Sequence, residues 1–235
     1  KDGFIIQKFF NKKIIEKYKK KILSNLKKSA KKKNIKSIKS LIKLEDYFSI
    51  INNNDHNKLM DRDTRTIKID TFDEKIIIQN HLKPIFNYFS EKDFGIYRNK
   101  NTVSWKGRDI KNYAGFRIVK PNSKKVAGFH SDHYNLKDFR FTLWVPLIGF
   151  TKKYTLKMIP ASHLKKHSNT VTEKNPNGTA KLIKKSYISK FKKPIRPNLR
   201  LGEAILFHPY LIHGNAKNLG KKLRASMEIR IGKKN

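Results

Sequence analysis

The sequence predicts a mainly β fold with flanking α-helices, of the sandwich or barrel type such as a jelly roll. Beyond about residue 95, short segments rich in β-branched and aromatic residues alternate with Gly, Pro and Asn, as in antiparallel strands joined by turns. The first 92 residues instead carry helical patterns. The 235 residues suffice for one domain with a sizeable core. We therefore expect a single domain over 1–235, mostly helical over 1–92 and with a β core over 93–235.

The helical patterns fall into three segments. A first helix is predicted by one apolar stripe at helical spacing, formed by Ile14, Ile15, Tyr18, Ile22, Leu23 and Leu26. A second helix is predicted over 35–48, followed by a polar, turn-rich stretch over 52–65. A third fits 72–90, where Pro84 is expected to kink or break it.

The strand-like segments are 116–119, 126–130, 139–148, 154–159, 203–207 and 223–231. Alternation in FRFTLWV places Phe139, Phe141, Leu143 and Val145 on one face and Arg140, Thr142 and Trp144 on the other. The second face therefore lines something other than a simple core. Residues 164–200 hold nine lysines against one acid, Glu173. They are expected to form a long basic excursion, as lids and binding loops do.

The charge is unusual, with 55 Lys and Arg against 18 Asp and Glu, a formal net charge of +37. Such a field attracts nucleic acid, an anionic membrane surface or an acidic small molecule, although a solvated surface without a dedicated partner explains it equally well. We find no nucleic-acid recognition motif and few aromatic residues among the basic clusters, so nucleic acid is not the expected partner. Peripheral contact with an anionic membrane stays open.

Composition also restricts the chemistry. The sequence has no cysteine, which excludes disulfides and thiolate sites, so any metal must take nitrogen and oxygen ligands. No apolar run approaches 18 residues, so no membrane span is expected. The apolar patch in KDGFIIQKFF is too short for a signal peptide. A cytoplasmic protein is the resulting expectation.

Metal-ligating residue types gather in GFHSDHY, residues 128–134. On a strand, His130 and Asp132 lie two apart and point to the same face. A third ligand is expected from His213 in ILFHPYLIHGNAKN, with His208 as the competing candidate. Two histidines and one carboxylate on one face of an octahedron leave three positions open, the arrangement with which non-haem Fe(II) oxygenases hold a co-substrate and dioxygen.

A second signal lies eleven residues after His213, at Arg224. The planar guanidinium of arginine matches a carboxylate in two parallel hydrogen bonds. If 2-oxoglutarate chelates the iron through its keto acid end, Arg224 suits its far carboxylate. The hydroxyl of Ser226 lies two residues along the same strand face.

Together these motifs resemble those of the phytanoyl-CoA dioxygenase-like branch of the Fe(II)/2-oxoglutarate-dependent oxygenases. The resemblance is carried by Arg224 and by DGFII (2–6), HSD (130–132), WVPL (144–147), IPASH (159–163) and GEAILFHPYLIHG (202–214). IPASH departs from the family's PGSH-type stretch in having alanine for glycine. The resemblance spans most of the chain and is weakest over 30–110 and 164–196.

The resemblance implies a double-stranded β-helix (jelly roll, cupin-like) that binds Fe(II) through His130, Asp132 and His213 and binds 2-oxoglutarate through Arg224. With dioxygen, such an enzyme converts 2-oxoglutarate to succinate while hydroxylating a substrate. Related halogenases replace the carboxylate ligand, so Asp132 favours hydroxylation. Further expected cofactor contacts are Ser226, Thr142 and Trp144, and expected substrate contacts are Tyr134, Arg117 and His163.

The substrate is expected to be a small anion, such as an acidic or phosphorylated sugar or a CoA-linked acyl group, because the charge and the excursion over 164–200 are basic. Two other classes remain as alternatives: a basic protein that binds nucleic acid or an anionic surface, and a cupin-like scaffold without turnover. Oligomeric state is not predicted.

Overall fold

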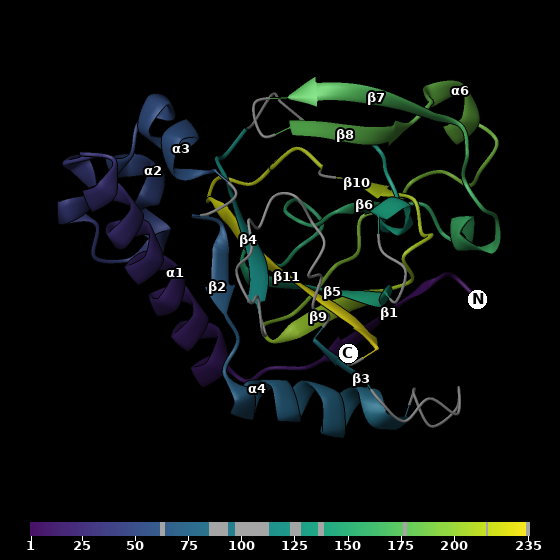
Figure 1. Ribbon diagram of the computed structural model, residues 1–235, viewed down its shortest axis with the longest axis horizontal. Helices are drawn as coiled ribbons and strands as arrows, with labels where there is room; N and C mark the ends of the chain where they lie inside the picture. Colours follow the sequence, from purple (N-terminus) through teal and green to yellow (C-terminus); the bar gives the residue numbers. More distant parts are fainter. Residues whose placement is uncertain are drawn as a thin grey trace.

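The computed structural model describes residues 1–61, 64–84, 94–96, 113–122, 128–135, 139–175, 178–214 and 216–233. Among the described residues, a seven-stranded β-sheet faces a second layer made of two two-stranded sheets, and helices cover the outside of the larger sheet (Figure 1). This is the predicted jelly roll. Within the described residues, no helix combines the length and the apolarity needed to cross a membrane.

The larger sheet has seven antiparallel strands, in the order β1-β9-β5-β11-β4-β2 with β3 also paired to β11. Its strands are β1 (Phe4–Lys8), β2 (Thr66–Lys68), β3 (Phe94–Ile96), β4 (Tyr113–Val119), β5 (Phe139–Ile148), β9 (Glu203–Phe207) and β11 (Arg224–Lys233). In the central pair, Thr142 and Trp144 of β5 lie opposite Arg230 and Glu228 of β11. This register decides which side chains meet inside the roll.

The opposite sheet is assembled from short pieces: β6 (Lys157–Met158), β10 (His213–Gly214) and the hairpin of β7 (Thr170–Asn175) and β8 (Gly178–Ile183). Met158 also bridges Ile195, and His130 bridges His213. The hairpin joins this sheet where the Ile183 amide donates to the Phe129 carbonyl at 2.7 Å. The basic excursion over 164–200 thus contains this hairpin and a short helix, α6 (Lys185–Ile188).

The predicted first helix is confirmed as α1 (Lys12–Lys32). The Asn11 side chain caps it by accepting from the Ile14 amide at 2.9 Å. The helix packs its apolar stripe on the outer face of the large sheet, in one cluster with Leu143, Val145 and Met227. Burial of each large aliphatic side chain is worth roughly 1.5–3 kcal/mol, so this contact anchors the helix.

The second helical prediction is wrong, whereas the third is confirmed over the part that the structure describes. The segment over 35–48 is not one helix but η1 (Ser37–Ser40), η2 (Leu44–Asp46) and the start of α2 (Tyr47–Ile50). The Ser40 hydroxyl donates to the Ser37 carbonyl and Leu41 is extended, which ends the first of these. The stretch over 52–65, expected to be turns, contains α3 (Asn53–Leu59), capped by the Asn52 side chain. α4 (Thr71–Lys75) continues into η3 (Ile76–Leu82), while 85–90 lie outside the described residues.

Most of the predicted strands are confirmed, but two of them differ and several further strands are present. Of 154–159 only the two residues of β6 are strand, and of 126–130 only His130 forms a bridge, with 123–127 outside the described residues. The strands β1, β2, β3, β7 and β8 are not among those predicted from the sequence. The two faces of β5 are as expected, because Leu143 and Val145 join the helix-side core whereas Trp144 joins a separate cluster inside the roll.

Candidate functional site

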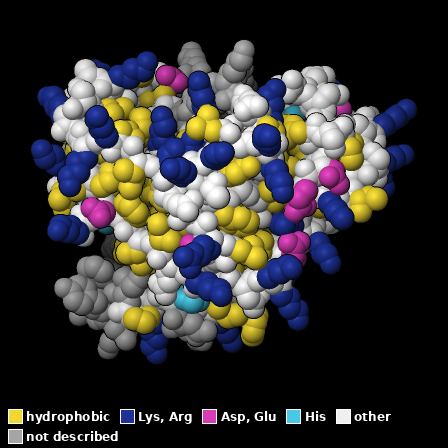
Figure 2. All heavy atoms as spheres, turned by 180° about the vertical axis from the view of Figure 1, so that it is seen from behind, with side chains coloured by type: hydrophobic (Ala, Val, Ile, Leu, Met, Phe, Trp, Pro, Cys, Tyr) yellow, Lys and Arg dark blue, Asp and Glu magenta, His cyan; other side chains and the backbone are white. Residues whose placement is uncertain are grey.

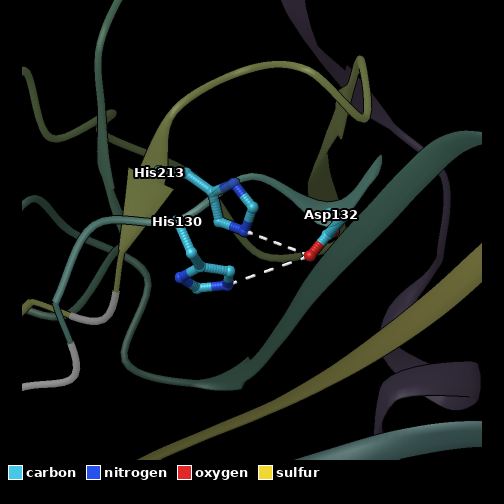
Figure 3. A group of neighbouring side chains, drawn as sticks. All are labelled: His130, Asp132 and His213. Atoms are coloured by element: carbon cyan, nitrogen blue, oxygen red, sulfur yellow. Dashed lines mark ion pairs between the residues drawn. The ribbon is translucent and has the colours of Figure 1, made fainter. Parts of the chain in front are cut away.

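The two histidines of the site are paired through their backbones. The His130 amide donates to the His213 carbonyl at 2.8 Å, and the His213 amide donates to the His130 carbonyl at 2.9 Å. Gly214 permits this approach, because a Cβ there would lie only 3.1 Å from the Gly128 carbonyl oxygen. Both imidazoles consequently project from adjacent strand positions toward Asp132, as Figure 3 shows.

Asp132 reaches the same point from a turn. It begins a short 3-10 helix, η5 (Asp132–Asn135). The expectation that His130 and Asp132 lie on one face of a strand is therefore wrong, although their side chains do approach each other. The Asp132 amide donates to the Pro209 carbonyl at 2.8 Å, and the Thr142 hydroxyl donates to Asp132 Oδ2 at 2.8 Å. These two bonds fix the backbone and the carboxylate, and they leave Oδ1 facing the imidazoles.

The three side chains offer a ligand atom each, and all these atoms lie within 4.8 Å of one another. Asp132 Oδ1 is 3.8 Å from His130 Nε2 and 3.9 Å from His213 Nε2. The other ring nitrogens face carbonyls, with His213 Nδ1 at 3.0 Å from Leu211 and His130 Nδ1 at 3.4 Å from Gly128. Such partners keep the proton on Nδ1 and leave Nε2 as the metal ligand. The set can therefore hold a divalent ion.

The electrostatics of the site favour the charge states that a metal needs. Burial alone would raise the pKa of Asp132, but the positive field of Arg230 and the neighbouring histidines outweighs it and lowers that pKa well below its usual range. Burial, with a contribution from His213, lowers the pKa of His130 to about 4. At neutral pH the site thus presents a carboxylate and a neutral imidazole.

Arg224 lies on β11 inside the roll and is 1% exposed. Its Nη1 donates to the carbonyls of Tyr154 at 3.0 Å and Ala216 at 3.1 Å. Its buried Nε has no hydrogen-bond partner among the described residues. Burial, reinforced by Arg117 and Arg196, lowers the pKa of Arg224 to about 10, which leaves it charged at neutral pH. A buried cation with an unused donor fits a carboxylate ligand.

The remaining expected residues divide into two groups. Ser226 and Thr142 are buried on the interior face, and Trp144 joins the apolar wall with Ile205 and Phe207. Arg117 pairs with Ser226 in the β4–β11 register and is exposed. These four positions therefore belong to the same interior or to its rim.

Among the described residues, His163 and His208 are not members of the group that could hold a metal. Their rings are 5.5 Å apart, His208 Nδ1 accepts from the Tyr210 amide at 3.2 Å, and a Cβ on Gly3 would lie 2.4 Å from His163 Nδ1. The His208 amide also donates to the Gly3 carbonyl at 2.9 Å, and among the described residues the group that could hold a metal contains His213 and not His208. The Tyr134 side chain lies outside the described residues.

Sequence reasoning missed Glu228 and Arg230. Arg230 Nη2 lies 3.7 Å from Asp132 Oδ1 and 3.0 Å from Glu228 Oε1. The available signal was the alternation along β11, where Arg224, Ser226, Glu228 and Arg230 share one face.

Comparison with protein families decides the assignment, because the model of the family described as phytanoyl-CoA dioxygenase (PhyH) matches residues 1–226. The chain belongs to the phytanoyl-CoA dioxygenase family. It is accordingly an oxygenase of the class that uses iron and 2-oxoglutarate, and both the His–Asp–His set and the partly unpaired Arg224 fit those cofactors. No curated protein matches the sequence.

Solved structures agree on the fold. The non-haem alpha-ketoglutarate-dependent carbocyclase SnoK from nogalamycin biosynthesis aligns with a TM-score of 0.57 and 10% identity, covering 99% of this chain and 80% of that one. EctD from S. alaskensis, solved with 2-oxoglutarate and 5-hydroxyectoine, gives 0.59 and 15%, covering 99% and 72%. The epimerase SnoN, solved with Fe3+, alpha-ketoglutarate and nogalamycin RO, gives 0.53 and 10%, covering 99% and 79%. A carbocyclase and an epimerase thus share this phytanoyl-CoA dioxygenase-type fold, and the fold alone leaves the reaction outcome open.

Proposed function

We propose that this member of the family hydroxylates a small anionic substrate. In this proposal His130, Asp132 and His213 bind Fe(II), and Arg224 with Ser226 binds the far carboxylate of 2-oxoglutarate. The observation that carries it is the convergence of three ligand atoms within 4.8 Å inside the same roll that holds a buried, partly unpaired guanidinium. A scaffold without turnover needs only one of these two features.

Bound iron would supply the redox chemistry in which 2-oxoglutarate and dioxygen yield succinate, carbon dioxide and a hydroxylated substrate. The chain's own residues prepare the site for it. Thr142 holds the carboxylate of Asp132 in one orientation, and the Leu211 carbonyl holds the tautomer of His213. The apolar wall around Trp144 and Phe207 excludes water from the interior.

An anionic substrate is supported by cations at the site itself rather than by the net charge. Arg117 lies on the rim, and Arg230 lies beside Asp132. On the outer surface, by contrast, Lys and Arg are scattered over the face in view with hydrophobic side chains between them (Figure 2). That distribution attracts anions in general but marks no single interface. An acidic or phosphorylated sugar, or a CoA-linked acyl group, has the required chemistry.

The test uses purified protein with Fe(II), 2-oxoglutarate, ascorbate and air, with succinate as the readout. Succinate should form even without the substrate, and omission of Fe(II) or addition of a chelator should stop it. A protein that binds Fe(II) in calorimetry yet releases no succinate would contradict the proposed hydroxylase function. The same result would favour one of the two non-catalytic alternatives, an anion-binding surface or a scaffold.

A further inference from the structure

We propose that Arg230 forms an oxyanion subsite beside the metal ligands, which binds the carboxylate or phosphate group of the substrate. The inference deepens the proposed function and rests on it. It assigns the two arginines inside the roll to two different ligands: Arg224 to the co-substrate and Arg230 to the substrate.

The position of Arg230 follows from strand register. Arg230 lies directly opposite Thr142 in the β5–β11 pair, and both side chains reach Asp132. Thr142 donates to Oδ2, while Arg230 Nη2 lies 3.7 Å from Oδ1, the oxygen that also faces the two imidazoles. Glu228, two residues earlier on the same face, accepts from Arg230 Nη2 at 3.0 Å. This bond orients the guanidinium toward the metal ligands.

Exposure separates the two arginines. Arg224 is 1% exposed, whereas the side chains of Arg230 and His130 are 38% and 29% exposed. Arg230 lies six positions after Arg224, which places their Cα atoms about 20 Å apart at the usual rise of about 3.4 Å per residue, so the two guanidiniums do not share one small acid group. The Arg224 end is therefore buried, and the Arg230 end is open to molecules that arrive from solvent.

The charge balance gives the open end its preference. A divalent metal, Asp132, doubly negative 2-oxoglutarate and Arg224 together cancel. Among the described side chains at the site, Arg117, Arg196 and Arg230 then remain against the carboxylate of Glu228, which leaves an excess of positive charge. In a partly buried site such an excess is best neutralised by a ligand that carries an acid group.

The same geometry couples the subsite to the metal. Among the proposed metal ligands, Asp132 carries the negative charge that faces Arg230. A bound metal would neutralise this charge, so Asp132 would no longer balance the charge of Arg230. Metal and guanidinium then repel each other, and an anion between them relieves the repulsion. Because such coupling is reciprocal, an oxyanion and the metal should each strengthen the binding of the other.

The test is calorimetric titration, without oxygen, of the full chain loaded with Fe(II) and saturating 2-oxoglutarate. The probes are benzoate, phenyl phosphate and the neutral benzamide. Wild-type protein should bind one equivalent of benzoate or phenyl phosphate, and the tighter of the two identifies the acid class. Benzamide should not bind. The same titration without metal should give weaker anion binding.

Two variants and a matched control complete the experiment. Arg230→Gln should weaken anion binding at least about tenfold, since a charge-assisted pair is worth roughly 1.5–3 kcal/mol. Arg230→Lys keeps the charge but loses the planar pair of donors, so its affinity for the anion should lie between those of wild type and Arg230→Gln. Anion binding by this variant also shows that a substitution at this position leaves the fold intact. Arg200→Gln removes the same charge from an exposed position and should bind the probes as wild type does.

Three results would overturn the subsite: no anion binding by wild type, equal affinity in wild type and Arg230→Gln, or benzamide binding as tightly as benzoate. The proposed function fails separately, through the absence of succinate from the wild-type protein. If an anion binds in a manner that depends on Arg230 but the protein makes no succinate, the subsite stands and the proposed hydroxylase function is refuted.

Discussion

The two faces of strand β11 differ completely in character. Ala225, Met227, Ile229 and Ile231 are 0% exposed and pack in the helix-side core. The alternate residues Arg224, Ser226, Glu228 and Arg230 face the interior of the roll. One strand therefore serves both the stability of the fold and the chemistry of the site, and its period of two keeps these roles on separate residues. Substitutions on the two faces should have separable effects.

The largest expected effect is on the site face, at Asp132. Asp132→Ala should abolish succinate formation and lower Fe(II) affinity more than about 100-fold, because loss of even an outer partner of a metal ligand costs about 10–100-fold. Calorimetric Fe(II) titration and the succinate assay measure both.

Asp73 is the matched control, a second buried carboxylate but in the helix layer. It accepts from Tyr18 and from Lys17, which lies 2.7 Å away. Asp73→Asn should lower the free energy of unfolding by about 1–3 kcal/mol while Fe(II) uptake persists. Equal loss of Fe(II) binding in both variants would show that the ligand assignment is wrong.

On the core face, Ile229→Ala should lower the free energy of unfolding by about 2–5 kcal/mol, through lost burial and the cavity that remains. Ile229→Val should cost only about 0.5–1.5 kcal/mol. Urea unfolding measures both, and the KM of the folded protein for 2-oxoglutarate should stay near the wild-type value. A large rise in that KM would show that the two faces of β11 are coupled.

Arg224→Gln returns to the site face with a smaller expected effect. The loss of a charge-assisted contact of roughly 1.5–3 kcal/mol should raise the KM for 2-oxoglutarate about 10–150-fold. Arg224→Lys should recover part of the loss, since it keeps the charge without the fork. An unchanged KM in Arg224→Gln would remove this residue from the co-substrate site.

The smallest expected effect concerns His56 in the helical layer, which is compared with His130 of the site. Burial, with Lys120 nearby, lowers the pKa of His56 in α3 to about 4, the same value as for His130. Because protonation then favours the unfolded chain, the stability from neutral His56 is present above about pH 6.5 and is lost as pH falls toward 4. His56→Gln should flatten the dependence of the unfolding midpoint on pH over this window, measured by urea at pH 7 and pH 5. An identical slope in wild type and variant would contradict it.

The sequence was most informative where function constrains it. The ordered set of His130, Asp132, His213 and Arg224 pointed to the site before any fold was known, and alternation alone separated the two faces of β5. Local patterns could not show that Asp132 enters through a 3-10 turn, because the bond from its amide to Pro209 joins distant segments.

Long-range pairing also explains the other misses. β1 is a strand because it pairs with β9, some two hundred residues later in the chain. Arg230 matters because the β5–β11 register sets it opposite Thr142, and no local pattern contains that register. The predicted helix over 35–48 breaks at Leu41, where the Ser40 hydroxyl bonds to the Ser37 carbonyl. The helical spacing of apolar residues does not register such a side-chain bond.

The reciprocal amide bonds between His130 and His213 have a consequence for handling the protein. The spacing of the two histidines is set by ordinary sheet geometry, so both are in position before an ion binds. Zinc fingers unfold when stripped of metal because their ligands are ordered only by the ion. Here a chelator should yield a folded, empty protein that can be reloaded with a chosen ion, and exchange of one metal for another becomes a practical preparation.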